Sequence, residues 1–177
     1  MDEVRTSKGK NMHPSKLNLI QTEIAIKQVK DSFERNLAAA LNLTRVSAPL
    51  FVPSDSGIND DLNGVERPVA FDVRATGGTV EIVHSLAKWK RYALAKYAFA
   101  AHSGLYCDMN AIRRDEDLDA LHSVYVDQWD WEKVILKEDR TRAFLEETVR
   151  TIYAVMRETA EDLCKAFPVL ENHFPEQ

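Results

Sequence analysis

A short run of polar and aromatic residues, 122–132, holds the densest set of groups in this chain that could bind a small polar ligand. Its residue types alternate as in a strand, so Val126, Gln128 and Asp130 should share one face, with Trp129 on the other. A carboxylate, an amide and two indoles packed this closely are costly to bury without a partner or a ligand. Taken alone, the run fits a strand with solvated acids equally well.

Two other places concentrate polar side chains. The loop at residues 55–64 is rich in acids and amides, which could hold an ammonium group or a metal but more often only form turns. Ser85 is placed to cap a helix, whose N-terminus and basic residues favour anions. Lys88 and Lys90 lie on different faces of that helix, so one at most should point at a shared ligand. The alternative is a capped surface helix.

Arg113 ends one expected strand, and Gln128 and Asp130 lie on the strand that returns beside it. A guanidinium can grip a phosphate with two parallel hydrogen bonds. A carboxylate and an amide opposite it could hold an amino group. Together they suggest a site for an amino acid and a nucleotide phosphate, with a surface ion-pair hairpin as the alternative.

The elements that would position these groups follow from periodicity and turn residues. In order, they are a helix at 22–41, an extended segment at 43–52, a strand at 69–75, a turn at 76–79, a strand at 80–83, a helix at 85–99, strands at 105–112 and 122–134, and a helix at 138–167. This order predicts an α+β fold with an antiparallel β-sheet flanked by helices. The last helix should bury an apolar stripe of Leu145, Val149, Ile152, Tyr153, Met156, Ala160 and Leu163.

The bulk composition excludes several classes of protein. At 177 residues the chain fits one domain, behind a flexible lead-in at residues 1–15. A net charge of −5 offers no basic field for nucleic acid or an anionic membrane, and no apolar run is long enough to span a bilayer. Cys107 and Cys164 are too few for a disulfide scaffold, which suggests reduced thiols in a cytoplasmic protein.

Four segments carry a family resemblance: VHSLAKWKR at 83–91, GLY at 104–106, RDED at 114–117 and LHSVYVDQWDWE at 121–132. They closely resemble the ammonia-dependent asparagine synthetases, or aspartate–ammonia ligases, and the similarity runs from about Leu19 to Phe167. That family in turn resembles the catalytic cores of class II aminoacyl-tRNA synthetases. The resemblance implies an antiparallel sheet flanked by helices, a cytoplasmic homodimer, and aspartate, ammonia and ATP as substrates.

The resemblance also implies a two-step reaction. Aspartate attacks ATP to give β-aspartyl-adenylate and pyrophosphate, and ammonia then displaces AMP to give asparagine. Arg113 matches the arginine that holds the α-phosphate and would stabilise charge there. Asp60 matches a residue on the aspartate and ammonia side, where it would orient ammonia or accept its proton.

The same resemblance implies an aspartate pocket. Gln128 matches a catalytic residue that lines the aspartate and ammonia side, and Asp130 would fix the α-ammonium of the substrate. Ser85 and Lys90 match residues expected near the carboxylates of the amino acid.

The chain departs from the family in its length. Members are nearly twice as long, and their second half supplies the Mg²⁺ ligands and a glycine-rich motif with an arginine for ATP. The last glycine here is Gly104, so we expect residues 16–177 to form the N-terminal part of the catalytic domain. Such an incomplete domain should hold no metal ligands and be inactive alone. The alternative is a truncated non-catalytic paralogue that binds aspartate or dimerises with a full-length enzyme.

Overall fold

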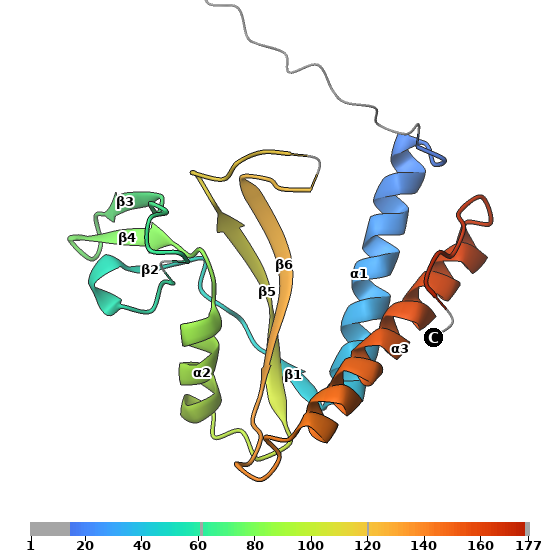
Figure 1. The fold of residues 1–177 in the computed structure, drawn as a ribbon. Helices are drawn as coiled ribbons and strands as arrows, with labels where there is room; N and C mark the ends of the chain where they lie inside the picture. The colour runs from blue at the N-terminus through green and yellow to red at the C-terminus, as the bar shows by residue number, and fades with distance from the viewer. Residues whose placement is uncertain (1–14, 61, 120, 176–177) are drawn as a thin grey trace, which may run out of the picture. The chain divides into compact units, whose positions relative to one another are not determined.

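The computed structural model describes residues 15–60, 62–119 and 121–175, and these fall into two compact units, 15–33 with 156–175 and Glu34–Val155. The expected lead-in lies outside the described residues except for Ser15. The elements are α1 (Leu19–Leu41), β1 (Leu43–Arg45), β2 (Phe51–Pro53), a 3-10 helix η1 (Ser54–Ser56), β3 (Ala70–Val73), β4 (Gly78–Ile82), α2 (Ala87–Lys96), β5 (Gly104–Ile112), β6 (Tyr125–Lys133) and α3 (Arg142–Ala166) (Figure 1).

Two three-stranded sheets form within the Glu34–Val155 unit. The first has the order β1-β5-β6, with β1 parallel to β5 and β6 antiparallel to it. The second has the order β2-β4-β3 and is antiparallel throughout. The extended segment expected at 43–52 therefore supplies one strand to each sheet, with Pro49, which has no N–H to donate, between them. The α+β prediction is confirmed.

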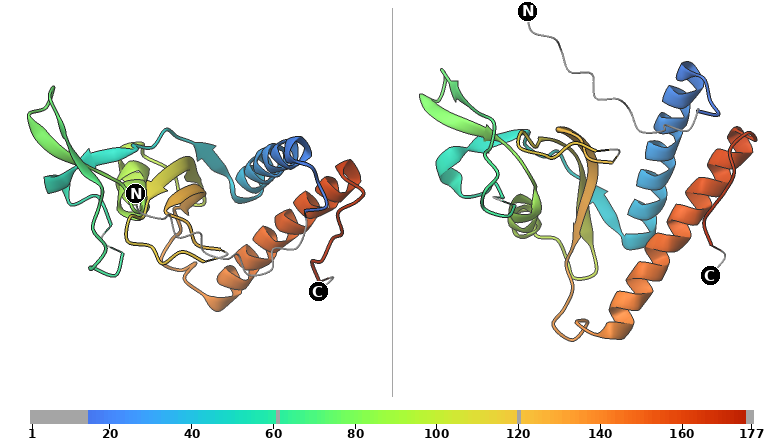
Figure 2. Two further views of the ribbon diagram at one scale, coloured as in Figure 1. Left: turned by 90° about the horizontal axis from the view of Figure 1, so that it is seen from above. Right: turned by 45° about the horizontal axis from the view of Figure 1, so that its top comes forward.

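The β5–β6 hairpin pairs nine residues on each strand, from Gly104 opposite Lys133 to Ile112 opposite Tyr125. Figures 1 and 2 show α2 beside this hairpin. The sequence predicts that the second strand of this hairpin begins at residue 122, but β6 begins at Tyr125. The reason is local: the Asp119 carboxylate accepts the backbone N–H groups of Leu121 and His122, which folds that segment into a turn.

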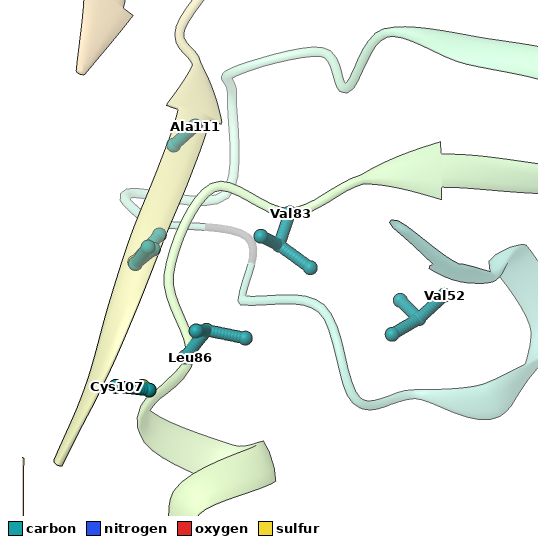
Figure 3. Close-up of a cluster of buried hydrophobic side chains, with 6 residues drawn as sticks. Val52, Val83, Leu86, Cys107 and Ala111 are labelled. Carbon is teal, nitrogen blue, oxygen red and sulfur yellow. The ribbon is translucent and has the colours of Figure 1, made fainter. Parts of the chain in front are cut away.

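The core of this unit lies where β5 meets the connection from β4 to α2. Its buried side chains are Val52, Val83, Leu86, Cys107, Met109 and Ala111 (Figure 3). Val126 and Trp89 pack against them from β6 and α2. Because alternate residues of β5 point into this cluster, one face of the β5–β6 hairpin is fixed against α2.

The turn between β3 and β4 lies two residues earlier than predicted, at residues 74–77 instead of 76–79. Both Thr76 and Gly77 donate their backbone N–H groups to the carbonyl of Val73. Gly77 takes a left-handed φ of 65°, which favours glycine, whereas Gly78 already pairs with Val73 in the sheet. The second glycine of the pair therefore belongs to the strand.

The prediction of a buried stripe on α3 is wrong in part. Leu145 and Val149 are 62% and 56% exposed, and Met156 is 39% exposed, whereas Val155 and Thr159 are buried. Periodicity identifies an apolar face but does not say what covers it. Within the described ranges, no helix is both long and apolar enough to cross a membrane.

Candidate functional site

Strand β6 presents two different faces, as its alternation predicted. Asp130 lies opposite Cys107 and Gln128 opposite Met109, so both share the side of the hairpin that carries the core cluster. On the other side the Trp129 ring packs at 4.7 Å from the ring of Tyr106. The acid and the amide therefore face α2, whereas the aromatic residue faces away.

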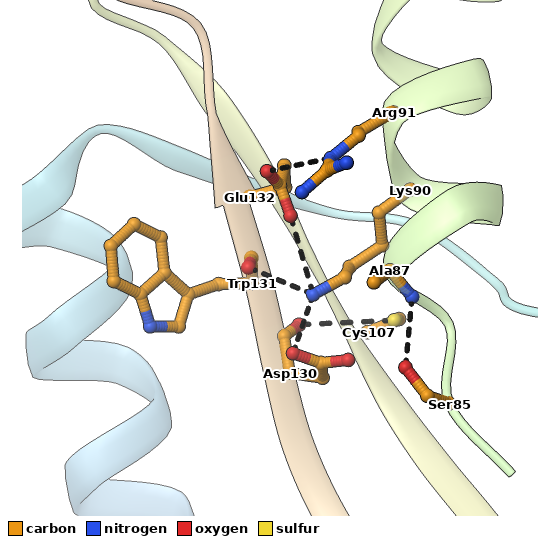
Figure 4. A network of polar contacts seen from close by, with 8 residues as sticks. All are labelled: Ser85, Ala87, Lys90, Arg91, Cys107, Asp130, Trp131 and Glu132. Atoms are coloured by element: carbon orange, nitrogen blue, oxygen red, sulfur yellow. Dashed lines mark hydrogen bonds and ion pairs between the residues drawn. The ribbon is translucent and has the colours of Figure 1, made fainter. Parts of the chain in front are cut away.

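Lys90 is the centre of the polar cluster on the α2 side (Figure 4). Its side chain is only 5% exposed, and its Nζ donates to Asp130 Oδ1 at 2.5 Å and to the carbonyl of Trp131 at 3.0 Å. Glu132 Oε2 lies 3.6 Å from the same nitrogen, and Arg91 Nε lies 3.7 Å from Glu132 Oε1. Two cations and two carboxylates thus form one balanced group of charges.

Lys88 reaches a different acid. Its Nζ donates to the carbonyl of Asn59 at 3.1 Å and lies 3.7 Å from Asp60 Oδ1. Asn59 is buried: its Oδ1 accepts the backbone N–H of His84 at 2.9 Å, and its Nδ2 donates to Glu81 Oε2 at 3.2 Å. Asn59 thereby attaches the acidic loop to the end of β4 and sets the position of Asp60.

Ser85 lies one residue before the N-cap of α2, so its predicted role as the N-cap is wrong. The cap position is Leu86, which makes no side-chain capping bond. The Ser85 hydroxyl instead accepts the N–H of Ala87 at 3.2 Å, a local serine turn that satisfies one of the free donors at the helix start. The preceding His84 is 1% exposed, and neither ring nitrogen has a hydrogen-bond partner among the described residues.

Arg113 lies directly after β5, where its backbone N–H donates to the carbonyl of Val124. Its Nη1 is 3.9 Å from Glu116 Oε2, and its buried Nε finds no partner in the described part of the chain. Gln128 pairs with Met109, four residues back along β5, which corresponds to about 13 Å of strand. The backbone of Arg113 therefore lies further along the hairpin than that of Gln128, at the end away from Lys90.

The charged loop after Arg113 is attached to the segment before β3. Asp115 accepts hydrogen bonds from the backbone N–H, Nε and Nη2 of Arg67, and Arg114 donates to the carbonyl of Pro68. The side-chain hydrogen bond from the Arg67 guanidinium holds the pKa of Asp115 well below its ordinary value. The charged loop is thus fixed at its beginning.

A second pair lies further along this loop. Asp119 Oδ2 is 2.9 Å from His122 Nδ1. The backbone N–H of Leu121, followed by the His122 side chain, lowers the pKa of Asp119 to about 2. The hydrogen bond to Asp119 raises the pKa of His122 above 6.5.

The chain has two cysteines, and Cys107 lies opposite Asp130 in the hairpin. Burial raises the pKa of the Cys107 thiol to about 11, so it is protonated at neutral pH, and Cys107 and Cys164 are both free thiols. Among the described residues, no group of three His, Cys, Asp or Glu side chains could hold a metal ion.

Sequence reasoning missed three residues of this arrangement. Glu132 follows Asp130 by two positions, so the strand period could have placed it beside Lys90. Asn59 precedes Asp60 in a loop of similar residues, and Arg67 lies in a segment with no assigned element, so neither gave a local signal. The roles assigned to Asp60, Ser85, Lys90, Arg113, Gln128 and Asp130 stay predictions.

Comparison with known proteins identifies the family. The aspartate-ammonia ligase family model matches residues 20–177. An aspartate–ammonia ligase of Ruminiclostridium cellulolyticum is 62% identical over 161 residues, which cover 90% of this chain and 48% of that protein. One of Bacillus cytotoxicus is 57% identical over 165 residues, covering 93% and 50%. The chain spans about half the length of these relatives.

The fold is shared with a class II aminoacyl-tRNA synthetase. Asparaginyl-tRNA synthetase of Entamoeba histolytica, solved in complex with asparaginyl-adenylate, superimposes with a TM-score of 0.55 at 12% identity, covering 89% of this chain and 32% of the synthetase. This likeness confirms the predicted fold class. The family match over residues 20–177 establishes that the chain belongs to the aspartate–ammonia ligase family.

Proposed function

We propose that this chain supplies the amino-acid and α-phosphate side of an aspartate–ammonia ligase that forms asparagine from aspartate, ammonia and ATP. The observation that carries the proposal is the Lys90 cluster: a buried ammonium group between two carboxylates, on the strand face that also carries Gln128. An α-amino acid carries an ammonium group and a carboxylate group on the same carbon atom. The cluster offers an acid for the first and a cation for the second.

The proposed pocket divides the groups of aspartate between strand and helix. Asp130 takes the α-ammonium, and Lys90 and Ser85 bind carboxylate oxygens. Gln128 orients the side chain of the substrate from the same face of β6. The low exposure of Lys90 supports this division, because a desolvated cation binds a carboxylate more strongly than one in water.

The proposed chemistry begins when a β-carboxylate oxygen of aspartate attacks the α-phosphorus of ATP and pyrophosphate leaves. Arg113 balances the charge that develops on the α-phosphoryl oxygens. Ammonia then attacks the β-carbonyl carbon, AMP leaves with the bonding electron pair, and one proton is released. Asp60 orients the ammonia or accepts this proton, with Lys88 at 3.7 Å to balance its charge.

ATP is a substrate of this reaction, and Mg²⁺ would accompany its phosphates. We propose, as the family resemblance implies, that the Mg²⁺ ligands come from the second half of the longer family members. We also propose a cytoplasmic homodimer with no nucleic acid as partner. The exposed apolar residues Leu19, Ile20 and Ile24 of α1 support an association, because clusters of this kind commonly mark protein interfaces.

Titration with L-aspartate, followed by the NMR signals of the backbone amides, tests the pocket. Shifts should concentrate at residues 85–91 and 126–132, and Asp130→Asn should weaken binding about tenfold, since a lost charge pair of this kind is worth about 1.4 kcal/mol or more. Succinate, which lacks the ammonium group, should bind weakly. Shifts of equal size elsewhere, or equal binding of succinate, would contradict the proposal.

A second experiment tests the prediction that residues 1–177 are inactive alone. Isotope-labelled aspartate, ammonia and MgATP are incubated with the chain, and asparagine is measured by mass spectrometry. We expect little or none. Sustained turnover by this polypeptide would show that its own residues complete the ATP site.

A further inference from the structure

Lys90 is shared by two acids at neighbouring positions of one strand face. Its Nζ lies 2.5 Å from Asp130 and 3.6 Å from Glu132, and the two carboxylate side chains are 28% and 27% exposed. Because β6 alternates with a period of two, these acids point to the same side. Lys90 thus has one close partner and one held slightly further away.

In the proposed substrate pocket, Asp130 binds the substrate as well as Lys90. When the α-ammonium of aspartate binds Asp130, it must compete with Lys90 for that carboxylate. A buried cation that loses its close acid partner is strongly destabilised unless another acceptor replaces it, and Lys90 is almost fully buried. Two acceptors then remain for it, the carbonyl of Trp131 at 3.0 Å and the carboxylate of Glu132.

We propose that Glu132 is a positioning residue that retains Lys90 in the pocket when the substrate ammonium takes Asp130. The site then holds an acid and a cation that are both available to the ligand, so it selects molecules that carry an ammonium and a carboxylate together. The substrate part of this proposal rests on the proposed function. The retention of Lys90 by Glu132 does not, and can be measured without any ligand.

Arg91 makes this arrangement possible without an excess of negative charge. It lies 3.7 Å from Glu132, and its side chain is 73% exposed. The carboxylate of Glu132 therefore lies between one buried and one solvated cation. Glu132 can therefore move closer to Lys90 when Asp130 is withdrawn.

The first test measures how far Lys90 is protected from acetylation by acetic anhydride, quantified by peptide mass spectrometry. Asp130→Asn imitates the withdrawal of Asp130 by the substrate and should leave Lys90 labelling within about twofold of the unmodified chain, whereas Asp130→Asn with Glu132→Gln should raise it about tenfold. Asp127→Asn, the same change on the opposite face of β6, is the matched control. Equal labelling in the single and double variants would overturn the proposal.

Circular dichroism shows whether each variant is folded before labelling. If the double variant is unfolded, Asp130→Asn with Glu132→Asp takes its place, since it keeps the charge but withdraws it by one methylene. That variant should label between the single variant and the unfolded chain. Labelling no higher than that of Asp130→Asn alone would show that the reach of Glu132 is irrelevant, and would refute its role.

The second test uses calorimetric binding of L-aspartate. Glu132→Gln should weaken L-aspartate binding about tenfold and leave the weak binding of succinate unchanged, and Glu132→Asp should restore part of the loss. An equal loss for both ligands would indicate a purely structural role and refute the proposal. If the unmodified chain binds no L-aspartate, the substrate assignment fails, while the labelling experiment still decides whether Glu132 retains Lys90.

Discussion

The backbone of β6 lies close to Gly104, and this gives a prediction whose size follows from the structure. A Cβ atom at this position would lie 2.3 Å from the carbonyl oxygen of Glu132, 2.7 Å from Leu43 Cδ2 and 2.8 Å from Lys133 Cα. Two of these atoms are backbone atoms of β6, so they cannot move as a flexible side chain would. Gly104 has no positive φ, so the effect of alanine would be steric.

Gly104→Ala must therefore separate strands that pair on both sides of β5. An ordinary contact of 3.4 Å requires the Glu132 oxygen to move by about 1.1 Å (3.4 minus 2.3), which disrupts the pairing of Gly104 with Lys133. Overpacking of this kind costs roughly 1–3 kcal/mol, and we expect the upper part of this range because backbone must shift. At about 2–4 °C per kcal/mol for a chain of this size, Tm should fall by roughly 4–12 °C.

Thermal unfolding followed by circular dichroism measures this loss, and Gly78→Ala is the matched control. Gly78 also begins a strand, but a Cβ there would meet nothing within 4 Å. Its substitution should change stability by no more than about 0.5 kcal/mol. If the two variants unfold at the same temperature, a Cβ at position 104 does not force the strands apart, and the steric argument is wrong.

Three further predictions follow from single contacts. The pKa of His122, measured by NMR titration, should lie above 6.5 and should fall in the Asp119→Asn variant. The contribution of this pair to the stability of the folded chain should be complete below pH 6.5 and should be lost as the pH rises through the pKa of His122 in the folded state. At about pH 8 the buried Cys107, with about one thiolate in a thousand, should react with iodoacetamide far more slowly than the partly exposed Cys164, as peptide mass spectrometry would show. Asn59→Ala should destabilise the chain by about 1–3 kcal/mol in urea unfolding, because buried partners lose their hydrogen bonds.

The faces of β6 could be predicted because a strand has a local period. Alternation alone placed Gln128 and Asp130 on one side and Trp129 on the other, and the pairing with β5 confirms it. The partner of Asp130 could not be predicted in this way. Lys90 comes from a helix 40 residues earlier, and its contact depends on how α2 packs against the hairpin.

The errors have equally physical reasons. The stripe on α3 was expected to be buried, but Leu145 and Val149 are exposed, because amphipathicity gives a helix an apolar face without specifying its partner. The glycine pair at the β3–β4 turn was taken as the centre of the turn, but only Gly77 needs a left-handed backbone. Ser85 was expected to be the N-cap of α2, but it lies one residue before the N-cap, Leu86. Its hydroxyl accepts the N–H of Ala87 instead.

The register of the β5–β6 hairpin links the fold to the candidate site. A slip of one residue would turn every side chain of β6 to the opposite face, so that Asp130 and Glu132 would leave Lys90 and the aromatic side chains would meet α2. The hydrophobic pattern resists such a slip, because Val126 of β6 packs against the core side chains of β5 and would leave them. The packing that fixes the register therefore also keeps Asp130 and Glu132 directed at the buried lysine.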